Sequence, residues 1–343
     1  MTAPVEPIKW IDHKLLLLDQ RLLPGEEHFV TCTTLEAAHD AIRDMIVRGA
    51  PAIGFTAIYG LALWLRSKQT LTYIELDQAA TYLKKARPTA VNLMYETDRV
   101  VSDLKRLFGD GSPAENAYQH VVKEGNKVWL EQHTKNLFMA ETGLSELTSL
   151  YGNRKLTLMT HCNTGVLACG VLGTALGVIS HAHSKGRIEL VYADETRPYM
   201  QGTRLTAYEL AKENIPYNIV VEGAASYVLS HQKVDAIFVG ADRIAANGDT
   251  ANKVGTATLA VVAKYYKVPF YVVAPLSSFD FSLKSGAEIE IELRHEDEIL
   301  KYKNHQVGPM LARALNPSFD VTPSSLITGI ISEKGIVHSP NLD

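Results

Sequence analysis

The pattern of apolar and polar residues divides the chain into a mainly helical part and a part where strands and helices alternate. Residues 8–32 form short apolar runs, and the turn pair Pro24-Gly25 among them indicates a hairpin or small sheet. From Thr34, an expected helix N-cap, apolar residues recur at helical spacing. This pattern breaks at VRGAPAIG and resumes from Phe55. Further helices are predicted at about residues 75–86, 92–108 and 113–149.

After Gly152 the rhythm changes to short, β-branched runs separated by helical stretches. The predicted strands are KLTLMTHC, RIELVYADE, YNIVVEGA, DAIFVGADRI and PFYVVAPL, with SLITGIISEKGI adding a last one. Alternation at this spacing is typical of a doubly wound parallel sheet. We therefore predict an α/β chain, with a helical domain and a short β start over residues 1–150 and a sheet domain over residues 151–343.

The glycine-rich stretch GVLGTALG follows the first of these strands but is not a dinucleotide fingerprint. It lacks the G-x-G-x-x-G spacing, and we interpret it as part of an apolar helix whose small residues allow close packing. A nicotinamide-dependent oxidoreductase is accordingly disfavoured.

Composition narrows the class of protein. The 343 residues are 46% hydrophobic and 21% charged, which is ordinary for a globular chain with room for two domains. A net charge of -4 gives no sign of the basic stripe that nucleic-acid binding requires. The three cysteines are too few for a disulfide framework and form no C-x-x-C pair, which favours a reducing cytoplasm. No signal peptide and no apolar run of about 20 residues, the length of a membrane span, are evident.

Two arginines stand beside turns that precede helices. Arg48 precedes a Gly-Ala-Pro turn, where backbone N–H groups and a guanidinium suit an anion, although a corner between two helices explains the same residues equally well. Arg87 precedes Pro88 and, taken alone, is better explained as a surface arginine. Together, Arg48 and Arg87 would suit a phosphate group.

A cysteine occupies the expected junction between the first strand of the sheet domain and the next helix. There, the helix dipole would favour the thiolate of Cys162. The alternative is a buried structural cysteine, the common fate of this residue type. The polar neighbours in HCNTG weigh against that alternative, whereas Cys169, inside the apolar helix, is interpreted as core.

Further polar side chains follow other strands of the same sheet. Gln201 comes after the second strand, Asp242 directly after the fourth, and Asn252 and Lys253 in the loop beyond. Because the carboxyl ends of parallel strands meet at one edge, these residues and Cys162 are expected to converge there. Helix capping would explain some of the Asp and Asn residues, but not an Asp-Arg pair directly after an apolar strand.

Several motifs together resemble one known family. They are RGAPAIG, RPTAVNL, HCNTG, ADETRPYMQGTRLTAYEL, GADRIAANGDTANKVGT and NPSFDVTPSSLITGIISEKGI. In combination, from about residue 10 to about residue 338, they resemble the methylthioribose-1-phosphate isomerases. That superfamily also holds ribose-1,5-bisphosphate isomerase and the regulatory subunits of initiation factor two B. The cysteine of HCNTG with the aspartate of GADRI resembles the isomerase branch.

The resemblance implies a fold, an activity and a set of site residues. It implies a helical domain, a Rossmann-like domain, a cleft between them and a homodimer, with no metal and no nucleotide cofactor. The implied activity is aldose–ketose isomerisation of 5-methylthioribose 1-phosphate to 5-methylthioribulose 1-phosphate in methionine salvage, a branch of amino-acid biosynthesis. Cys162 and Asp242 match the catalytic pair. The residues that match substrate contacts are Arg48, Gly49, Ala50, Arg87, Gln201, Asn252 and Lys253.

Two departures from the family pattern leave the sugar open. The chain has VVEGAAS where the family has Thr-Asp-Asn/Ser-Met-Ala, and IELRHEDE where it has Glu-Glu-Arg. Both spare the catalytic pair, but the altered loop follows a sheet strand, where it would line the pocket for the group on C5. 5-Deoxyribose 1-phosphate, in 5-deoxyribose salvage, is therefore an alternative substrate. Ribose 1,5-bisphosphate is another, although no extra basic cluster is evident. The non-enzymatic alternative is a regulatory subunit like those of initiation factor two B.

Cys162 and Asp242 are expected to act in acid–base catalysis. A carboxyl group in a dry site has a raised pKa, so Asp242 is expected to act as the acid that opens the sugar ring. Cys162 is expected either to remove the C2 proton or to shape an apolar pocket for direct hydride transfer.

Overall fold

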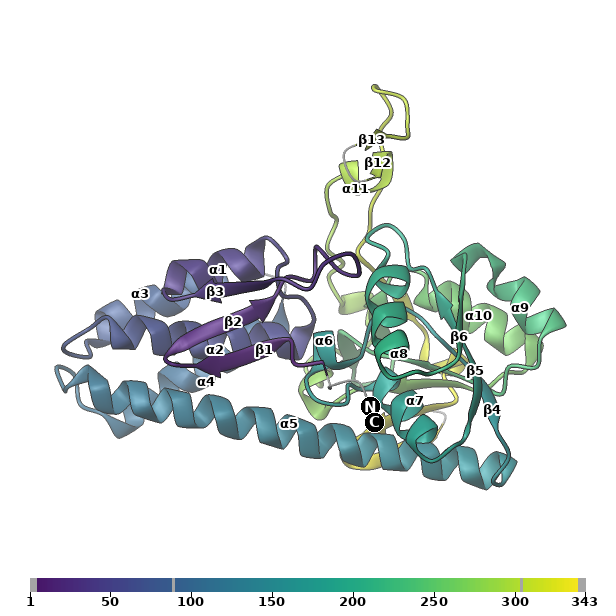
Figure 1. Ribbon diagram of the computed structural model, residues 1–343, viewed down its shortest axis with the longest axis horizontal. Coiled ribbons are helices and arrows are strands. Elements are labelled where there is room, and N and C mark those ends of the chain that lie inside the picture. Colours follow the sequence, from purple (N-terminus) through teal and green to yellow (C-terminus); the bar gives the residue numbers. More distant parts are fainter. Residues whose placement is uncertain (1–4, 88–89, 303–304, 339–343) are drawn as a thin grey trace. The chain divides into compact units, whose positions relative to one another are not determined.

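The computed structural model describes residues 5–87, 90–302 and 305–338. The chain forms two compact units (Figure 1). The first contains Met1–Asn136 and Gly165–Gly173, and the second contains Leu137–Thr164 and Thr174–Asp343.

The first unit joins a small antiparallel sheet to a set of helices. Its strands, in the order β1-β2-β3, are β1 (Ile8–Ile11), β2 (Lys14–Leu18) and β3 (Phe29–Cys32), which confirms the sheet predicted over residues 8–32. Its helices are α1 (Leu35–Arg43), α2 (Ala50–Arg66), α3 (Tyr73–Lys84), α4 (Val91–Leu107), the first part of α5 (Ala114–Tyr151) and α6 (Val166–Cys169).

Local chemistry explains where the first two helices begin. The Thr34 hydroxyl accepts a hydrogen bond from the Ala37 N–H, as expected of an N-cap. Helix α2 begins at Ala50, earlier than the predicted resumption at Phe55, because Pro51 lies in the first turn, where its missing N–H costs nothing. Almost all of α2 is buried, so it forms the centre of the first unit.

Helix α5 is unusually long, with 38 residues, and is shared between the two units. Charged residues recur along its whole length. Among the described residues, none of the helices combines the length and the apolar character that a membrane span would need.

The second unit is built on a seven-stranded sheet. The strands are β4 (Leu156–Thr160), β5 (Ile188–Asp194), β6 (Tyr217–Val220), β7 (Ala236–Val239), β10 (Phe270–Val273), β15 (Gly329–Ser332) and β16 (Gly335–His338). Their order is β16-β15-β10-β7-β4-β5-β6, and every pair except β15–β16 is parallel. This order confirms the predicted doubly wound α/β sheet.

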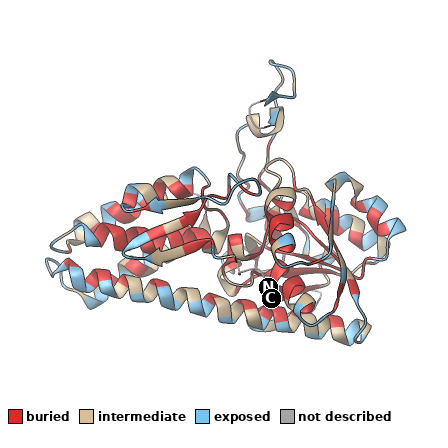
Figure 2. Cartoon of the chain, viewed as in Figure 1, coloured by how far each residue is buried: buried red, intermediate tan, exposed pale blue. Residues whose placement is uncertain are grey.

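Helices cover both faces of this sheet. On one face, Leu158 and Phe238 pack with α7 (Ala175–Ser184), α8 (Ala207–Lys212) and the end of α5. On the other, Met159 and Ile237 pack with α9 (Ala225–His231) and α10 (Thr256–Tyr266). Figure 2 shows the resulting buried strands between partly exposed helices. Neighbouring residues of one strand thus bury opposite sides, as the two-residue period of a strand requires.

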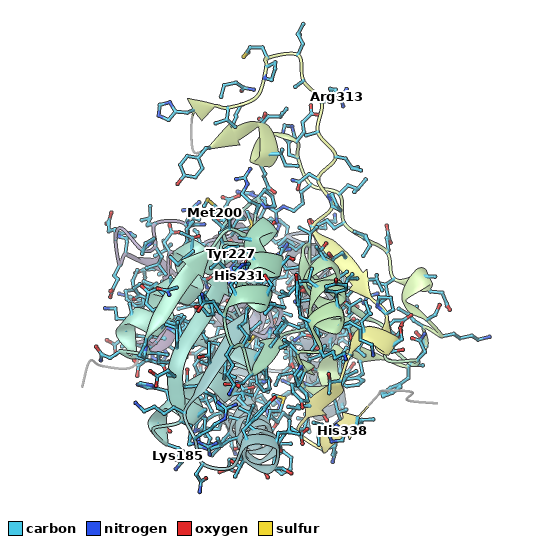
Figure 3. The ribbon with its side chains drawn as sticks, turned by 90° about the vertical axis from the view of Figure 1, so that its right-hand side faces the viewer. Lys185, Met200, Tyr227, His231, Arg313 and His338 are labelled. Carbon is cyan, nitrogen blue, oxygen red and sulfur yellow. The ribbon has the colours of Figure 1, made fainter. Side chains whose placement is uncertain are left out.

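The outer side of α9 carries polar and aromatic side chains. Tyr227 and His231, both labelled in Figure 3, stack with ring centroids 4.3 Å apart and are largely exposed. They lie one helical turn apart, the spacing at which side chains on a helix surface meet.

A smaller sheet and an arm complete the second unit. The sheet has the order β11-β8-β9-β14, formed by β11 (Phe279–Asp280), β8 (Arg243–Ala245), β9 (Thr250–Lys253) and β14 (Phe319–Thr322). The arm contains α11 (Asp297–Leu300), β12 (Lys301–Tyr302) and β13 (His305–Gln306), stands out from the rest of this unit in Figure 1 and carries Arg313 in Figure 3. The sequence predicted only a loop between Asp242 and α10, and β8 and β9 correct that prediction.

The sequence predicted one continuous helix after HCNTG, and this prediction is wrong because the structure has two helices there. Helix α6 ends at Cys169 and α7 begins at Ala175. Between them, Gly170, Leu172 and Gly173 have φ values of 77°, 75° and 80°, which a right-handed helix excludes. Cys169 is buried, as predicted.

Candidate active site

The backbone of Cys162 has an uncommon conformation. It follows β4 with φ of 64°, in the left-handed region that non-glycine residues rarely adopt. Two threonine hydroxyls hold it there: the Cys162 N–H donates to Thr196 Oγ1 at 2.9 Å, and Thr206 Oγ1 donates to the Cys162 carbonyl at 2.5 Å. The residue is 7% exposed.

Those threonines belong to a buried network on the segment after β5. Thr196 donates onward to the Asp194 carbonyl, and Thr206 accepts from the Asn163 amide, which also donates to Glu209. Thr206 ends the π-helical turn η1 (Gly202–Thr206). A π-helical turn of this kind is rare and frequently lies at a functional site.

The helix expected to activate the Cys162 thiol is too short for that purpose. Helix α6 has four residues and begins at Val166, and its segment belongs to the first unit. A helix dipole needs several aligned peptide groups, so the predicted stabilisation of the thiolate by a helix has no basis here.

Asp242 follows β7, the strand adjacent to the β4 strand that precedes Cys162. Strands β4 and β7 pair with Thr160 opposite Phe238, so their carboxyl ends lie side by side. A Cβ placed on Gly240 would be 2.5 Å from Thr164 Cγ2, which brings the two following segments into direct contact. Asp242 is half-buried, and its N–H donates to the Ala251 carbonyl at 2.9 Å.

The sheet reverses its winding at this same place. From β4 the chain continues outward through β5 and β6, whereas β7, β10 and β15 are added on the other side. In open α/β sheets, ligands bind outside the carboxyl ends of the strands at such a switch point.

Asn252 and Lys253 end strand β9. Asn252 is buried, and its amide donates to Thr256 Oγ1 at 3.0 Å. Lys253 Nζ donates to the Ser318 carbonyl at 2.7 Å and lies 4.5 Å from the centre of the Phe319 ring. The hydrogen bond from Asp242 to Ala251 joins this strand end to the Asp242 segment.

Gln201 directly precedes η1 and follows Met200, which is labelled in Figure 3. Its side chain is 4% exposed, and its Oε1 has no hydrogen-bond partner among the described residues. A buried amide oxygen left without a donor is costly, so this atom is suited to accept a hydrogen bond from a ligand.

The remaining predicted site residues belong to the first unit. Arg48 is buried, and Gly49 is the N-cap of α2 with φ of 96°. A Cβ on Gly49 would lie 2.5 Å from Ala168 Cβ, so glycine is required for α2 and α6 to pack. Ala50 is the first residue of α2, and Arg87 is half-buried between α3 and α4. Pro88 and Thr89 of the RPTAVNL motif lie outside the described residues.

His161, a buried histidine next to Cys162, was not predicted as a functional residue from the sequence. His161 Nδ1 lies 3.0 Å from Asp194 Oδ2, and its Nε2 lies 2.9 Å from the Val254 carbonyl. Burial raises the pKa of Asp194, and it raises that of Glu222 as well. A histidine beside the candidate cysteine was a usable signal, but its partners are distant in sequence. Among the described residues, no group of three or more His, Cys, Asp or Glu side chains is arranged to hold a metal ion.

Comparison with known proteins agrees with this architecture. The model of the initiation factor 2 subunit family matches residues 46–339. The methylthioribose-1-phosphate isomerase of Natranaerobius thermophilus is 44% identical over 341 residues, which cover 98% of this chain and 97% of that protein.

Two solved structures are also similar. The 5-methylthioribose 1-phosphate isomerase of Pyrococcus horikoshii has a TM-score of 0.90 at 39% identity, covering 99% of this chain and 94% of that one. The translation initiation factor eIF-2B, subunit delta, of A. fulgidus has a TM-score of 0.86 at 35% identity, covering 98% and 96%. These matches confirm the resemblance drawn from the motifs. The chain thus belongs to the initiation factor 2 subunit family, among relatives that include the methylthioribose-1-phosphate isomerases.

Proposed function

We propose that the chain is an aldose–ketose isomerase that converts 5-methylthioribose 1-phosphate to 5-methylthioribulose 1-phosphate, a step of methionine salvage. The observation that carries the proposal is near-full-length similarity, at 44% identity, to a methylthioribose-1-phosphate isomerase. Cys162 and Asp242, at the ends of adjacent strands at the switch point, supply the residue types that the chemistry needs.

Cys162 and Asp242 act as the catalytic pair in this proposal. Arg48, Arg87 and Lys253 hold the phosphate, since cationic side chains favour it electrostatically and keep it from leaving. Gly49 and Ala50 contribute backbone groups at the start of α2. The side chains of Gln201 and Asn252 bind sugar hydroxyls, and the unpartnered Gln201 Oε1 supports this role.

The substrate imposes a particular order of events. The phosphate ester keeps C1 in a cyclic acetal, so no free aldehyde is present, and opening the ring with the phosphate in place leaves C1 as a cationic centre that must gain a hydrogen. Asp242 donates a proton to the ring oxygen while the bond from that oxygen to C1 breaks. One hydrogen must then move from C2 to C1, and the C2 hydroxyl must lose its proton to form the ketone.

Two routes for this hydrogen agree with the residues. Cys162 removes the C2 proton to give an enol phosphate, which is then protonated at C1; alternatively, hydride moves directly from C2 to C1 beside an apolar Cys162. Product formed in deuterium oxide distinguishes them. Deuterium at C1 requires the proton route, and complete retention of the original C2 hydrogen favours hydride transfer.

The substituent at C5 of the sugar is the part of the substrate that the VVEGAAS segment concerns. In the departing VVEGAAS segment, Val221 and Gly223 are exposed, and Glu222 Oε2 accepts a hydrogen bond from the Arg197 N–H at 3.0 Å. 5-Deoxyribose 1-phosphate is therefore retained as an alternative substrate, and ribose 1,5-bisphosphate as a third.

The experiment that tests the proposal measures ketose 1-phosphate formation by the purified chain on the three sugars. The highest kcat/KM is expected on 5-methylthioribose 1-phosphate. A higher value on another sugar would reassign the substrate.

A regulatory subunit is the second candidate, because the similar A. fulgidus structure is described as a translation initiation factor. Cys162 and Asp242 favour the enzyme. Absence of turnover on all three sugars would favour the regulatory subunit.

Location and assembly complete the proposal. The three cysteines are thiols in the structure, which supports a reducing cytoplasm. We expect a homodimer, because the arm exposes apolar side chains of the kind that association buries, among them Met310 and Leu311. Sedimentation equilibrium at twice the chain mass would support it, and a monomer at micromolar concentration would contradict it.

A further inference from the structure

One peptide group near the candidate site is held at both of its polar ends. The Val254 carbonyl lies 2.9 Å from His161 Nε2, and the N–H of the same peptide, on Gly255, donates to Asp320 Oδ2 at 2.7 Å. Gly255 has φ of 103°, and a Cβ there would lie 2.7 Å from His161 Cε1. The histidine ring and this peptide are therefore in direct contact.

The chemistry of the contacts fixes the role of each ring nitrogen. A carbonyl oxygen only accepts, so His161 Nε2 carries a hydrogen and donates it to Val254. The other nitrogen, Nδ1, shares a proton with the Asp194 carboxyl group. The ring is fully buried, with Asp194, Glu222 and Asp320 as the charged groups that face it. Burial opposes the charged ring, but Asp194 outweighs it and raises the pKa of His161.

This contact joins the two segments that carry proposed site residues. His161 directly precedes Cys162, and Val254 directly follows Lys253. We infer that His161 is a positioning residue that fixes Lys253 relative to Cys162, with Asp194 orienting its ring. The inference rests on the proposed isomerase function, and it assigns His161 no contact with substrate.

Two substitutions separate this role from simple packing. His161→Gln places an amide N–H near the position of Nε2 and can still donate to the Val254 carbonyl. His161→Asn places its amide near Nδ1, so it can reach Asp194 but not Val254. The two variants remove the same ring: only His161→Gln keeps the link to Val254, and only His161→Asn keeps the link to Asp194.

The readout is the kinetics of 5-methylthioribose 1-phosphate isomerisation. We expect His161→Asn to raise KM about tenfold, the effect of one lost hydrogen bond at the upper end of its usual range, with a smaller change in kcat. His161→Gln should keep KM within about threefold of wild type.

Lys253→Met provides the decisive background. If His161 acts through Lys253, then His161→Asn should change KM by less than about twofold in a chain that already carries Lys253→Met. Additive losses would mean that His161 acts independently of Lys253, and would overturn the inference.

Other outcomes are equally informative. If His161→Asn has the same KM as the wild type, the inference about His161 is overturned. The proposed isomerase function is unaffected by that result, because the comparison is possible only with an active wild-type chain. An inactive wild-type chain would overturn the proposed function, and the inference with it. If thermal melting shows that His161→Asn does not fold, Asp320→Ala, which removes both acceptor oxygens, tests the other end of the same peptide. It should raise KM several-fold in the wild-type background and have no effect in the Lys253→Met background.

Discussion

The conformation of Cys162 is maintained by its neighbours. A non-glycine residue with φ of 64° carries backbone strain of about 1–3 kcal/mol, which surrounding contacts must offset. Here, the hydroxyls of Thr196 and Thr206 bond the backbone N–H and carbonyl of the same residue. The direction of the Cys162 side chain therefore depends on two residues from the segment after β5.

We predict that Thr206→Val loosens this arrangement. Valine keeps the shape of threonine but cannot donate to the Cys162 carbonyl, so stability should fall by about 1–2 kcal/mol and turnover about tenfold. Thr203→Val, on the same π-helical turn, is the matched control, because the Thr203 hydroxyl has no hydrogen-bond partner among the described residues. Thermal melting measures the stability of both variants, and initial rates measure their turnover. Equal losses in the two variants would contradict the prediction.

Gly202 permits a second close approach at the same turn. A Cβ there would lie 1.6 Å from the Asp194 carbonyl oxygen, and that backbone cannot move without displacing β5. Gly202→Ala should therefore destabilise the protein by more than about 3 kcal/mol, measured by denaturant unfolding. Gly223→Ala meets nothing within 4 Å and should change stability by less than about 0.5 kcal/mol. If Gly202→Ala leaves the free energy of unfolding unchanged, the close approach of this turn to the Asp194 carbonyl oxygen is contradicted.

At the scale of elements, Asp249 joins the turn between β8 and β9 to two neighbouring loops. Its carboxylate accepts from the Ser324 N–H at 2.8 Å, the Gly286 N–H at 3.0 Å and the Asn247 amide at 2.9 Å. Burial opposes the charge, but these donors outweigh it and hold the pKa of Asp249 below its ordinary value.

The stabilisation from Asp249 should depend on pH. Because folding lowers this pKa, the contribution is complete above the unfolded-state value of about 4 and is lost as pH falls through the folded-state value. Asp249→Asn should thus cost roughly 1–3 kcal/mol at pH 7, and this cost should shrink as pH falls below about 4, as measured by urea unfolding. The exposed Glu189→Gln should change little at either pH. If the free energies of unfolding of wild type and Asp249→Asn differ by the same amount at every pH, this assignment is contradicted.

The elements that the sequence predicted are those with strong periodicity. The β-branched runs became β4, β5, β6, β7 and β10, and the three later helices of the first unit lie close to their predicted bounds. The interruption between α6 and α7 was missed because Gly170 and Gly173 were interpreted as packing residues of a helix, although both have positive φ. Strands β8 and β9 were missed because three or four residues are too few for a periodic signal.

The candidate site was predictable only in part. Strand-end polar residues indicated Cys162 and Asp242, since sheet topology brings the ends of adjacent strands together. The hydroxyls that hold Cys162 and the partners of His161 depend on tertiary contacts across 33 to 93 residues, which no local pattern encodes.

At the scale of the whole molecule, the proposed residues are distributed over both compact units. The second unit holds Cys162 and Asp242 at its switch point, and the first holds Arg48 and Arg87. The proposed mechanism depends on the assignment of catalysis to Cys162 and Asp242.

The most direct measurement compares product formation from 5-methylthioribose 1-phosphate by the wild-type chain, Cys162→Ala and Asp242→Asn, all shown to be folded by thermal melting. We expect turnover by the wild type and a loss of about 100-fold or more in each variant, the scale of an acid–base contribution. An inactive wild type, or near-normal turnover in either variant, would contradict it.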